Sequence, residues 1–182
     1  MRRLGDIGIW DHYVPADLCQ RMIDHFESSV VKTRNEEKCV DTYMFLQDES
    51  LRKEYALHLR DLGDEYFEFY GHNTWRKQSL PIQMKIQKAE PDGGFVGLHW
   101  EQGQGELNAT RYAAWMTYLN TVEKGGKTVF PLQDRLAVTP QIGTTLIWPA
   151  GFTHPHHSFP DLCENKYILT GWFSYRLTNP SK

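Results

Sequence analysis

The sequence predicts an α+β protein in which helices come first and an antiparallel β-core follows. Two observations support this order. Before residue 80, apolar residues recur every three or four positions, which is the spacing of an amphipathic helix. From residue 82 onward, apolar and polar residues alternate, which is the pattern of a half-buried strand. The 182 residues suit one domain over 1–182, with mainly helical support in 1–80 and the β-core in 81–182.

Two helices are expected in the first part of the chain. The first spans 15–28, where Pro15 suits the first turn. The second spans 49–70 and follows Asp48, a residue type that caps helix N-termini. Residues 31–40 carry mixed charges without a clear period, so they are expected to form a loop. The apolar residues at helical spacing are Leu18, Met22, Phe26, Leu51, Tyr55, Leu59, Leu62, Tyr66 and Phe69.

Short strands separated by Gly and Pro are expected in the second part. Ile82, Met84 and Ile86 alternate with polar residues and predict a half-buried strand, and a turn over 91–94 follows it. Many short strands with turn residues between them favour a β-sandwich or barrel over alternating βαβ units. Further strand-like runs lie at 95–101, 112–119, 127–130, 144–148 and 166–175.

The composition disfavours several classes of partner. Lys and Arg total 20 against 23 for Asp and Glu, giving a net charge of −3, so a nucleic-acid partner is not expected. No apolar run approaches the ~20 residues of a membrane span, so no membrane partner is expected either. Three widely spaced cysteines, Cys19, Cys39 and Cys163, are typical of free thiols in a reducing compartment. We therefore expect a cytoplasmic monomer.

The spacing of His99 and Glu101 indicates a metal site. On a strand, residues two apart project from the same face, so both side chains can reach one ion. An imidazole from a distant segment, either His154, His156 or His157, would complete a set of two histidines and one carboxylate. Such a set leaves coordination positions open for substrates and is typical of non-haem Fe(II) oxygenases. The alternative is that the distant histidines are polar loop residues without a metal.

Lys166 supports the same interpretation. It begins a strand whose one face also carries Ile168, Thr170 and Trp172. A lysine that faces into a barrel is costly unless it is paired with an anion, and a dicarboxylate cosubstrate would supply that anion. The alternative is a lysine at a strand end that reaches out to water.

A longer series of motifs surrounds these residues: His99-x-Glu101, Tyr118-Leu119-Asn120, Gly125–Pro131, Pro140 with Gly143, Leu146–Pro149, the distal His, Lys166-Tyr167 and Trp172. With them, the stretch from Met84 to Tyr175 resembles the prolyl 4-hydroxylase-like branch of the 2-oxoglutarate/Fe(II)-dependent dioxygenases. It is most similar to small phage- and bacterium-encoded members, which share a Trp-rich segment like 148–154 and a Glu in the metal site. The resemblance implies a double-stranded β-helix (jelly-roll) core with N-terminal helices buttressing one sheet.

The resemblance also implies the metal ligands. His99 would be the proximal ligand, Glu101 the carboxylate ligand and His156 the distal ligand, because the family places this His shortly before the Lys-Tyr pair. If His154 were the ligand instead, the metal site would remain and only the register would change. The family's commoner carboxylate is Asp, and this chain has Glu, which is longer by one methylene.

The cosubstrate site is implied in the same way. Lys166 would bind the distal carboxylate of 2-oxoglutarate, Tyr118 would donate a hydrogen bond to it, and Trp172 would pack along its pocket. The resemblance implies Fe(II), 2-oxoglutarate and O2 as cofactor and cosubstrates, with ascorbate as an optional reductant. The expected reaction is hydroxylation of an unactivated C–H bond, with release of succinate and CO2. A prolyl or other peptidyl residue is the first expected substrate, and a free amino acid or other small molecule is the alternative.

Three other functions compete with this one. A related branch demethylates nucleic acids, but it carries Arg where this chain has Lys166 and a second Arg where it has Trp172. A halogenase needs the carboxylate ligand replaced, and Glu101 is present. A non-catalytic metal-binding jelly-roll module needs no cosubstrate site, so the presence of Lys166 and Tyr118 beside the triad favours turnover.

Overall fold

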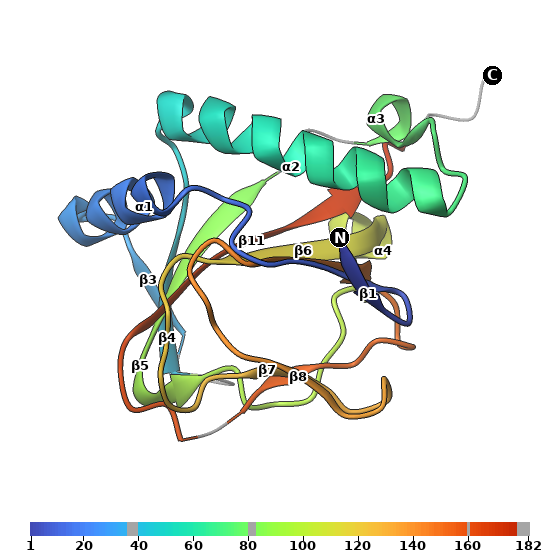
Figure 1. Ribbon diagram of the computed structural model, residues 1–182. Helices are drawn as coiled ribbons and strands as arrows, with labels where there is room; N and C mark the ends of the chain where they lie inside the picture. Colours follow the sequence, from blue (N-terminus) through green and yellow to red (C-terminus); the bar gives the residue numbers. More distant parts are fainter. Residues whose placement is uncertain (36–39, 80–82, 160, 178–182) are drawn as a thin grey trace.

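Two antiparallel sheets face each other, and helices cover the outer side of the larger one (Figure 1). The structure is a computed structural model that describes residues 1–35, 40–79, 83–159 and 161–177. The larger sheet contains, in spatial order, β1 (Arg2–Leu4), β2 (Ile7–Trp10), β9 (Thr145–Pro149), β6 (Arg111–Tyr118), β11 (Lys166–Ser174), β5 (Met84–Gly94), β4 (Val40–Phe45) and β3 (Thr33–Asn35). The smaller contains β10 (His157–Ser158), β7 (Thr128–Phe130) and β8 (Leu136–Val138).

The two long helices form where the sequence predicts them. They are α1 (Ala16–Ser28) and α2 (Glu49–Phe69), and two short helices, α3 (Trp75–Gln78) and α4 (Glu106–Ala109), follow. The side chain of Asp48 accepts a hydrogen bond from the Leu51 amide at 2.8 Å, so the predicted cap is confirmed. Pro15 occupies the N-cap position of α1 rather than its first turn. No helix in the described ranges is long and apolar enough to cross a membrane.

The N-terminal part contributes more than helices. Its strands β1 to β4 extend both edges of the larger sheet, which the sequence analysis did not predict. The expected loop over 31–40 contains β3, which pairs with β4. An edge strand with polar side chains lacks the alternation by which a buried strand is found. Ile82 and Cys39 lie outside the described residues.

The turn predicted over 91–94 is a bulge inside β5. Ala89 pairs with Asp41 and Gly94 pairs with the preceding residue, Val40, so the residues between 89 and 94 loop out of the ladder. Positive φ angles of 59° at Asp92 and 107° at Gly94 allow the chain to turn out and back within the strand. The turn residues were recognised correctly, but the strand resumes beyond them.

The core has two layers that hold the central strands rigid. One lies between the helices and the larger sheet, and the other lies between the two sheets. In the first layer the Tyr55 hydroxyl of α2 lies 2.6 Å from Thr117 Oγ1, which in turn lies 2.6 Å from Thr145 Oγ1. This buried chain of hydroxyls ties α2 to β6 and β9. These strands and β11 therefore form a fixed base for the space between the sheets.

We expect Asp48→Ala to lower the free energy of unfolding by about 1 kcal/mol, because the Leu51 amide loses its acceptor. Asp48→Asn is the matched control, because its side-chain oxygen can still accept that hydrogen bond. Urea unfolding followed by circular dichroism measures both variants. Equal losses in the two would show that the cap does not stabilise α2.

Candidate active site

A cavity of about 350 Å³ opens between the two sheets. Lys166, Thr170 and Trp172 of β11 all line it, so the predicted common face of this strand is confirmed. The smaller sheet contributes Thr128 and Ser158. Each sheet therefore forms one wall of the cavity, and polar groups from both walls point into the same space.

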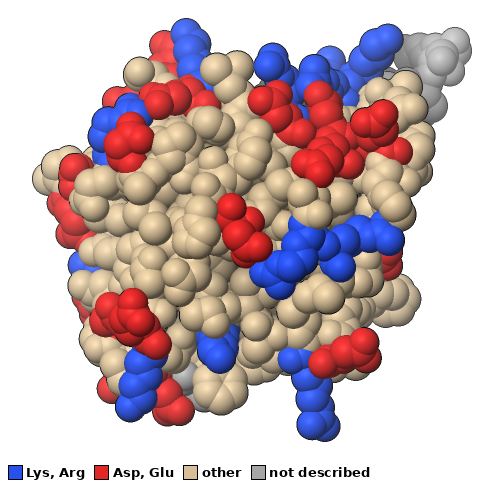
Figure 2. Space-filling view, in the orientation of Figure 1, with Lys and Arg blue, Asp and Glu red and all other residues tan. Residues whose placement is uncertain are grey.

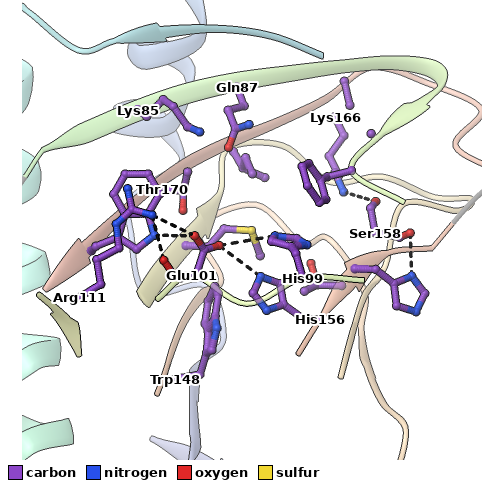
Figure 3. A pocket seen from close by; sticks show the side chains of 18 of the residues that line it. Lys85, Gln87, His99, Glu101, Arg111, Trp148, His156, Ser158, Lys166 and Thr170 are labelled. Carbon is purple, nitrogen blue, oxygen red and sulfur yellow. Dashed lines mark hydrogen bonds and ion pairs between the residues drawn. The ribbon is translucent and has the colours of Figure 1, made fainter. Parts of the chain in front are cut away.

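Three metal-binding side chains meet in this cavity. His99 Nε2 lies 3.6 Å and His156 Nε2 3.4 Å from Glu101 Oε1. The ligand atoms of the three residues all lie within 4.8 Å of one another, and Figure 3 shows Glu101 beside both imidazoles. His154 lies outside this cluster, and its Nδ1 lies 2.9 Å from Thr153 Oγ1. Of the histidines that the sequence left open, His156 is the one that joins His99 and Glu101.

Backbone pairing places the two histidines. The strand predicted over 95–101 is wrong, because His99 takes part only in an isolated bridge with His156. The His99 amide donates to the His156 carbonyl at 3.1 Å, and the His156 amide donates to the His99 carbonyl at 2.8 Å. Glu101 is held separately, since its amide donates to the Ala150 carbonyl at 3.1 Å. The side chains converge although the segment is not a regular strand.

The imidazoles are oriented as a metal requires. His99 Nδ1 lies 2.9 Å from the Gly97 carbonyl oxygen, and His156 Nδ1 lies 3.1 Å from the His154 carbonyl oxygen. A carbonyl oxygen only accepts, so each Nδ1 carries the proton and donates it. In the neutral rings each Nε2 then keeps its lone pair, and both Nε2 atoms face Glu101. This donor set fits a divalent metal ion with open positions, as in non-haem Fe(II) sites.

The second carboxylate oxygen of Glu101 is engaged by residues that sequence reasoning did not connect to it. Trp172 Nε1 donates to Glu101 Oε2 at 2.7 Å. Arg111 donates to the Glu101 carbonyl at 3.0 Å, and its Nη1 lies 3.8 Å from Oε2. The guanidinium also lies 3.6 Å from the centre of the Trp172 ring. The one signal in the sequence was Arg111 at the start of the apolar strand β6, because a cation in such a place is expected to have an acidic partner.

Glu101 remains ionised in this setting. Burial alone would raise the pKa of its carboxyl, but when the rings of His156 and His99 are protonated on both nitrogens, hydrogen bonding and attraction from them hold that pKa well below its ordinary value. The side chain therefore offers a charged Oε1 to the imidazole side while Oε2 accepts from the indole. Figure 3 shows Arg111 on the opposite side of Glu101 from the histidines.

Lys166 is a buried cation at another side of the cavity. Its Nζ donates to the Gly126 carbonyl at 2.8 Å and to Ser158 Oγ at 2.9 Å (Figure 3). Burial lowers the pKa of this ammonium to about 8. Both acceptors are neutral, so they do not neutralise the charge. An anionic group on a ligand would therefore be stabilised here.

Tyr118 is placed differently from Lys166 and Trp172, the other residues predicted to bind the cosubstrate. It is fully buried and does not line the cavity. Its hydroxyl lies 2.7 Å from Thr128 Oγ1 and 3.2 Å from the Val138 carbonyl oxygen. Thr128, the hydrogen-bond partner of Tyr118, does line the cavity. A direct hydrogen bond from Tyr118 to a cosubstrate thus stays a prediction, and Thr128 is a contact that sequence reasoning missed.

Solved structures share this architecture. A prolyl-4-hydroxylase from Pseudomonas putida has a TM-score of 0.74 and 19% identity, with 94% of each chain covered. A prolyl hydroxylase from Trichoplax adhaerens, in complex with a hypoxia inducible factor peptide fragment, has a TM-score of 0.69 and 14% identity over 93% of this chain and 84% of that one. The viral collagen prolyl hydroxylase of Paramecium Bursaria Chlorella virus-1, as its 2OG complex, has a TM-score of 0.63 and 17% identity over 91% and 94%. These likenesses establish the jelly-roll fold.

Sequence comparison identifies the family. The subunit alpha-1 of prolyl 4-hydroxylase from Gallus gallus is 34% identical over 73 residues, which are 36% of this chain and 14% of that protein's length. The model of the 2OG-Fe(II) oxygenase superfamily matches residues 84–174, half of the chain, and this range contains His99, Glu101, His156, Lys166 and Trp172. The chain therefore belongs to the 2OG-Fe(II) oxygenase superfamily.

Proposed function

We propose that this protein is a 2-oxoglutarate- and Fe(II)-dependent dioxygenase that hydroxylates an unactivated C–H bond of a prolyl or other peptidyl residue. The observation that carries the proposal is the meeting, in one cavity, of two lone-pair-bearing Nε2 atoms, an ionised carboxylate and a buried lysine. The matched superfamily uses Fe(II) and 2-oxoglutarate. The likeness to several prolyl hydroxylase structures favours a peptidyl substrate.

His99, Glu101 and His156 would hold the metal, and Lys166 would hold the distal carboxylate of 2-oxoglutarate. When bound, Fe(II) and 2-oxoglutarate supply the oxidising chemistry for O2-dependent hydroxylation, with succinate and CO2 as co-products. The protein's residues do the rest. The backbone bridge between the two histidines fixes their spacing, and the carbonyls behind each Nδ1 fix the ring orientation.

Trp172 and Arg111 orient the carboxylate ligand. Because the Trp172 indole N–H donates a hydrogen bond to Oε2, Glu101 presents only its other oxygen, Oε1, toward the imidazoles. This arrangement gives the longer Glu the role that Asp has in most of the family. We further propose that residues 1–182 act as one domain, since β1 to β4 complete the sheet that carries Lys166 and Trp172.

A free amino acid or other small molecule is the alternative substrate, and a non-catalytic metal-binding module is the alternative function. The buried charge of Lys166 favours an enzyme over a non-catalytic metal-binding module. Lys166 has no role in metal binding and yet is held inside the cavity. The halogenase and nucleic-acid demethylase alternatives lack support in the geometry. Glu101 occupies the carboxylate position, and charges of both signs are mixed over the face in Figure 2.

We expect His99→Ala and His156→Ala each to weaken binding of a divalent metal by more than about 100-fold, since each removes a ligand atom. His154→Ala is the matched control and should leave metal affinity near the wild-type value. Anaerobic titration with Fe(II) or Co(II), followed by calorimetry, measures the affinities. Loss of binding in the His154 variant alone would move the distal ligand to that residue.

Trp172→Phe keeps an aromatic ring, although a smaller one, and removes the indole N–H. Metal affinity should fall about 10-fold, because Glu101 Oε2 loses the donor that orients the carboxylate. The absorption bands of bound Co(II) should change as well, since a freed Oε2 allows a different coordination geometry. Unchanged affinity together with an unchanged Co(II) spectrum would show that the indole only fills space.

Lys166→Ala should weaken 2-oxoglutarate binding by about 10- to 150-fold and leave metal binding nearly intact, because one charge-assisted contact is lost. The wild-type affinity should also fall as pH rises above about 8, since the ammonium must be protonated to hold the carboxylate. Lys166→Arg should remove this pH dependence, because a guanidinium stays charged. Anaerobic titrations with 2-oxoglutarate at a series of pH values, with metal present, measure the affinity of the wild type and of both variants. A flat wild-type profile would place the anchor elsewhere.

The reaction class is tested by turnover. Aerobic protein with Fe(II) and 2-oxoglutarate should produce succinate, and a prolyl-peptide library should yield products heavier by one oxygen atom in mass spectrometry. The His99→Ala variant should produce neither. Binding of both Fe(II) and 2-oxoglutarate without any succinate, with or without peptides or amino acids, would favour the non-catalytic alternative.

A further inference from the structure

The outer face of the smaller sheet differs from that of the larger. Helices α1, α2 and α3 cover the larger sheet on its outer side, whereas no helix in the described part of the chain covers β7, β8 and β10 (Figure 1). Antiparallel sheets can expose one face to water, but such a face is normally polar. The outer face of this sheet is partly apolar and is bordered by charged residues.

Strand register assembles the side chains of that face. Val129 of β7 pairs with His157 of β10 on one side and with Ala137 of β8 on the other, so the three form a row. The Phe159 amide donates to the Lys127 carbonyl at 2.7 Å, which continues the pairing by one more row. Alternate residues of the same strands, such as Thr128, Phe130, Val138 and Ser158, are buried between the sheets. The outer residues border a groove of about 560 Å³.

The groove combines an apolar floor with a basic rim. Val129, Pro131 and Phe159 supply apolar surface, and Phe159 is 45% exposed. The charged residues that line the groove are Lys124, Lys127, Arg135 and Asp161. Among the residues that the structure describes, the two lysines and the arginine form no ion pair with an acid. The groove thus has an excess of positive charge in a chain whose net charge is −3.

The groove and the active-site cavity lie on opposite faces of the smaller sheet and share one lining residue. His157 lines both, and it directly follows the metal-site residue His156. A single extended chain that enters the cavity can therefore continue over β10 onto the outer face of the smaller sheet. Apolar side chains would lie on the floor, and acidic side chains would meet the rim.

We propose that this groove binds a flanking segment of the peptide substrate, and that this segment is acidic with interspersed apolar residues. The inference rests on the proposed function, because it takes the substrate to be a peptide. Three cations around an apolar floor suit a short acidic segment better than a nucleic acid, whose binding needs a longer run of phosphate contacts. A second copy of this chain would bring a net negative charge but would have to match the groove in shape.

The test compares labelled peptides that share one central prolyl segment and differ only in their flanks, which carry Glu and Leu, Ser and Leu, or Lys and Leu. Anisotropy is measured on anaerobic protein loaded with Fe(II) and 2-oxoglutarate. We expect the Glu-flanked peptide to bind about 10-fold more tightly than the Ser-flanked one. This preference should shrink as salt is raised, because exposed charges are screened.

The decisive variant is Lys127→Glu with Arg135→Glu, which should lose or invert the preference. The matched control is Arg52→Glu with Lys77→Glu, two exposed cations of the helical layer, and it should keep the preference. Circular dichroism and metal titration verify that both variants fold. If the preference for the Glu-flanked peptide survives in the groove variant, or is absent in the wild type, the groove proposal is wrong and the proposed reaction is unaffected.

Two further outcomes separate this proposal from the reaction on which it rests. If the protein binds Fe(II) and 2-oxoglutarate but neither binds nor modifies any peptide, the peptide substrate and the groove proposal both fail. If sedimentation shows self-association that the groove variant abolishes, a second copy occupies the groove instead. Tight binding of single-stranded DNA that the same variant removes would likewise overturn the assignment to a peptide.

Discussion

The backbone pair between His99 and His156 is the contact on which the candidate site depends. These residues lie 57 positions apart in the chain, and their amides and carbonyls exchange two hydrogen bonds. The pair fixes the distance between the two imidazoles before any ligand arrives. It needs support on both sides, because an isolated bridge has no ladder of its own. The adjoining β10 strand, paired with β7, provides support on one side, and the amides of Glu101 and Gln102 on the Ala150 carbonyl provide it on the other.

The larger sheet supplies a second fixed reference. Strand β11 lies between β5 and β6 and presents Lys166, Thr170 and Trp172 on one face. Trp172 links the sheet to the metal site through Glu101, while Lys166 links it to the smaller sheet through Ser158. The Lys166–Ser158 contact therefore joins the two sheets at one side of the cavity, the Trp172–Glu101 contact joins the larger sheet to the segment that carries the metal site, and the hydrophobic layers behind them resist distortion.

Much of this arrangement could be predicted from sequence, and the failures have physical causes. Periodicity located α1 and α2 because each buries one continuous face. It missed β3 because an edge strand buries little, and it ended β5 early because a bulge has the residue pattern of a turn. The triad was found through residue types and a resemblance, but the argument from strand geometry was wrong: His99 and Glu101 converge through an irregular segment. The contacts of Trp172 and Arg111 with Glu101 depend on side-chain packing across β6 and β11, for which the only signal in the sequence was a cation at the start of an apolar strand.

The smaller sheet has the cavity on one face and the open groove on the other, and this has a consequence for how the enzyme could diversify. Along β7, even-numbered residues face the chemistry and odd-numbered residues face the solvent: Thr128 and Phe130 point inward, while Lys127, Val129 and Pro131 border the outer groove. Alternate residues of one strand thus form two different surfaces, an inner one beside the active-site cavity and an outer one that borders the proposed peptide groove. Substitutions at odd positions can alter what the outer surface accepts and leave the side chains of the inner surface unchanged in type. An insertion of a single residue would exchange the two surfaces, so these strands should tolerate changes of residue type far better than changes of length.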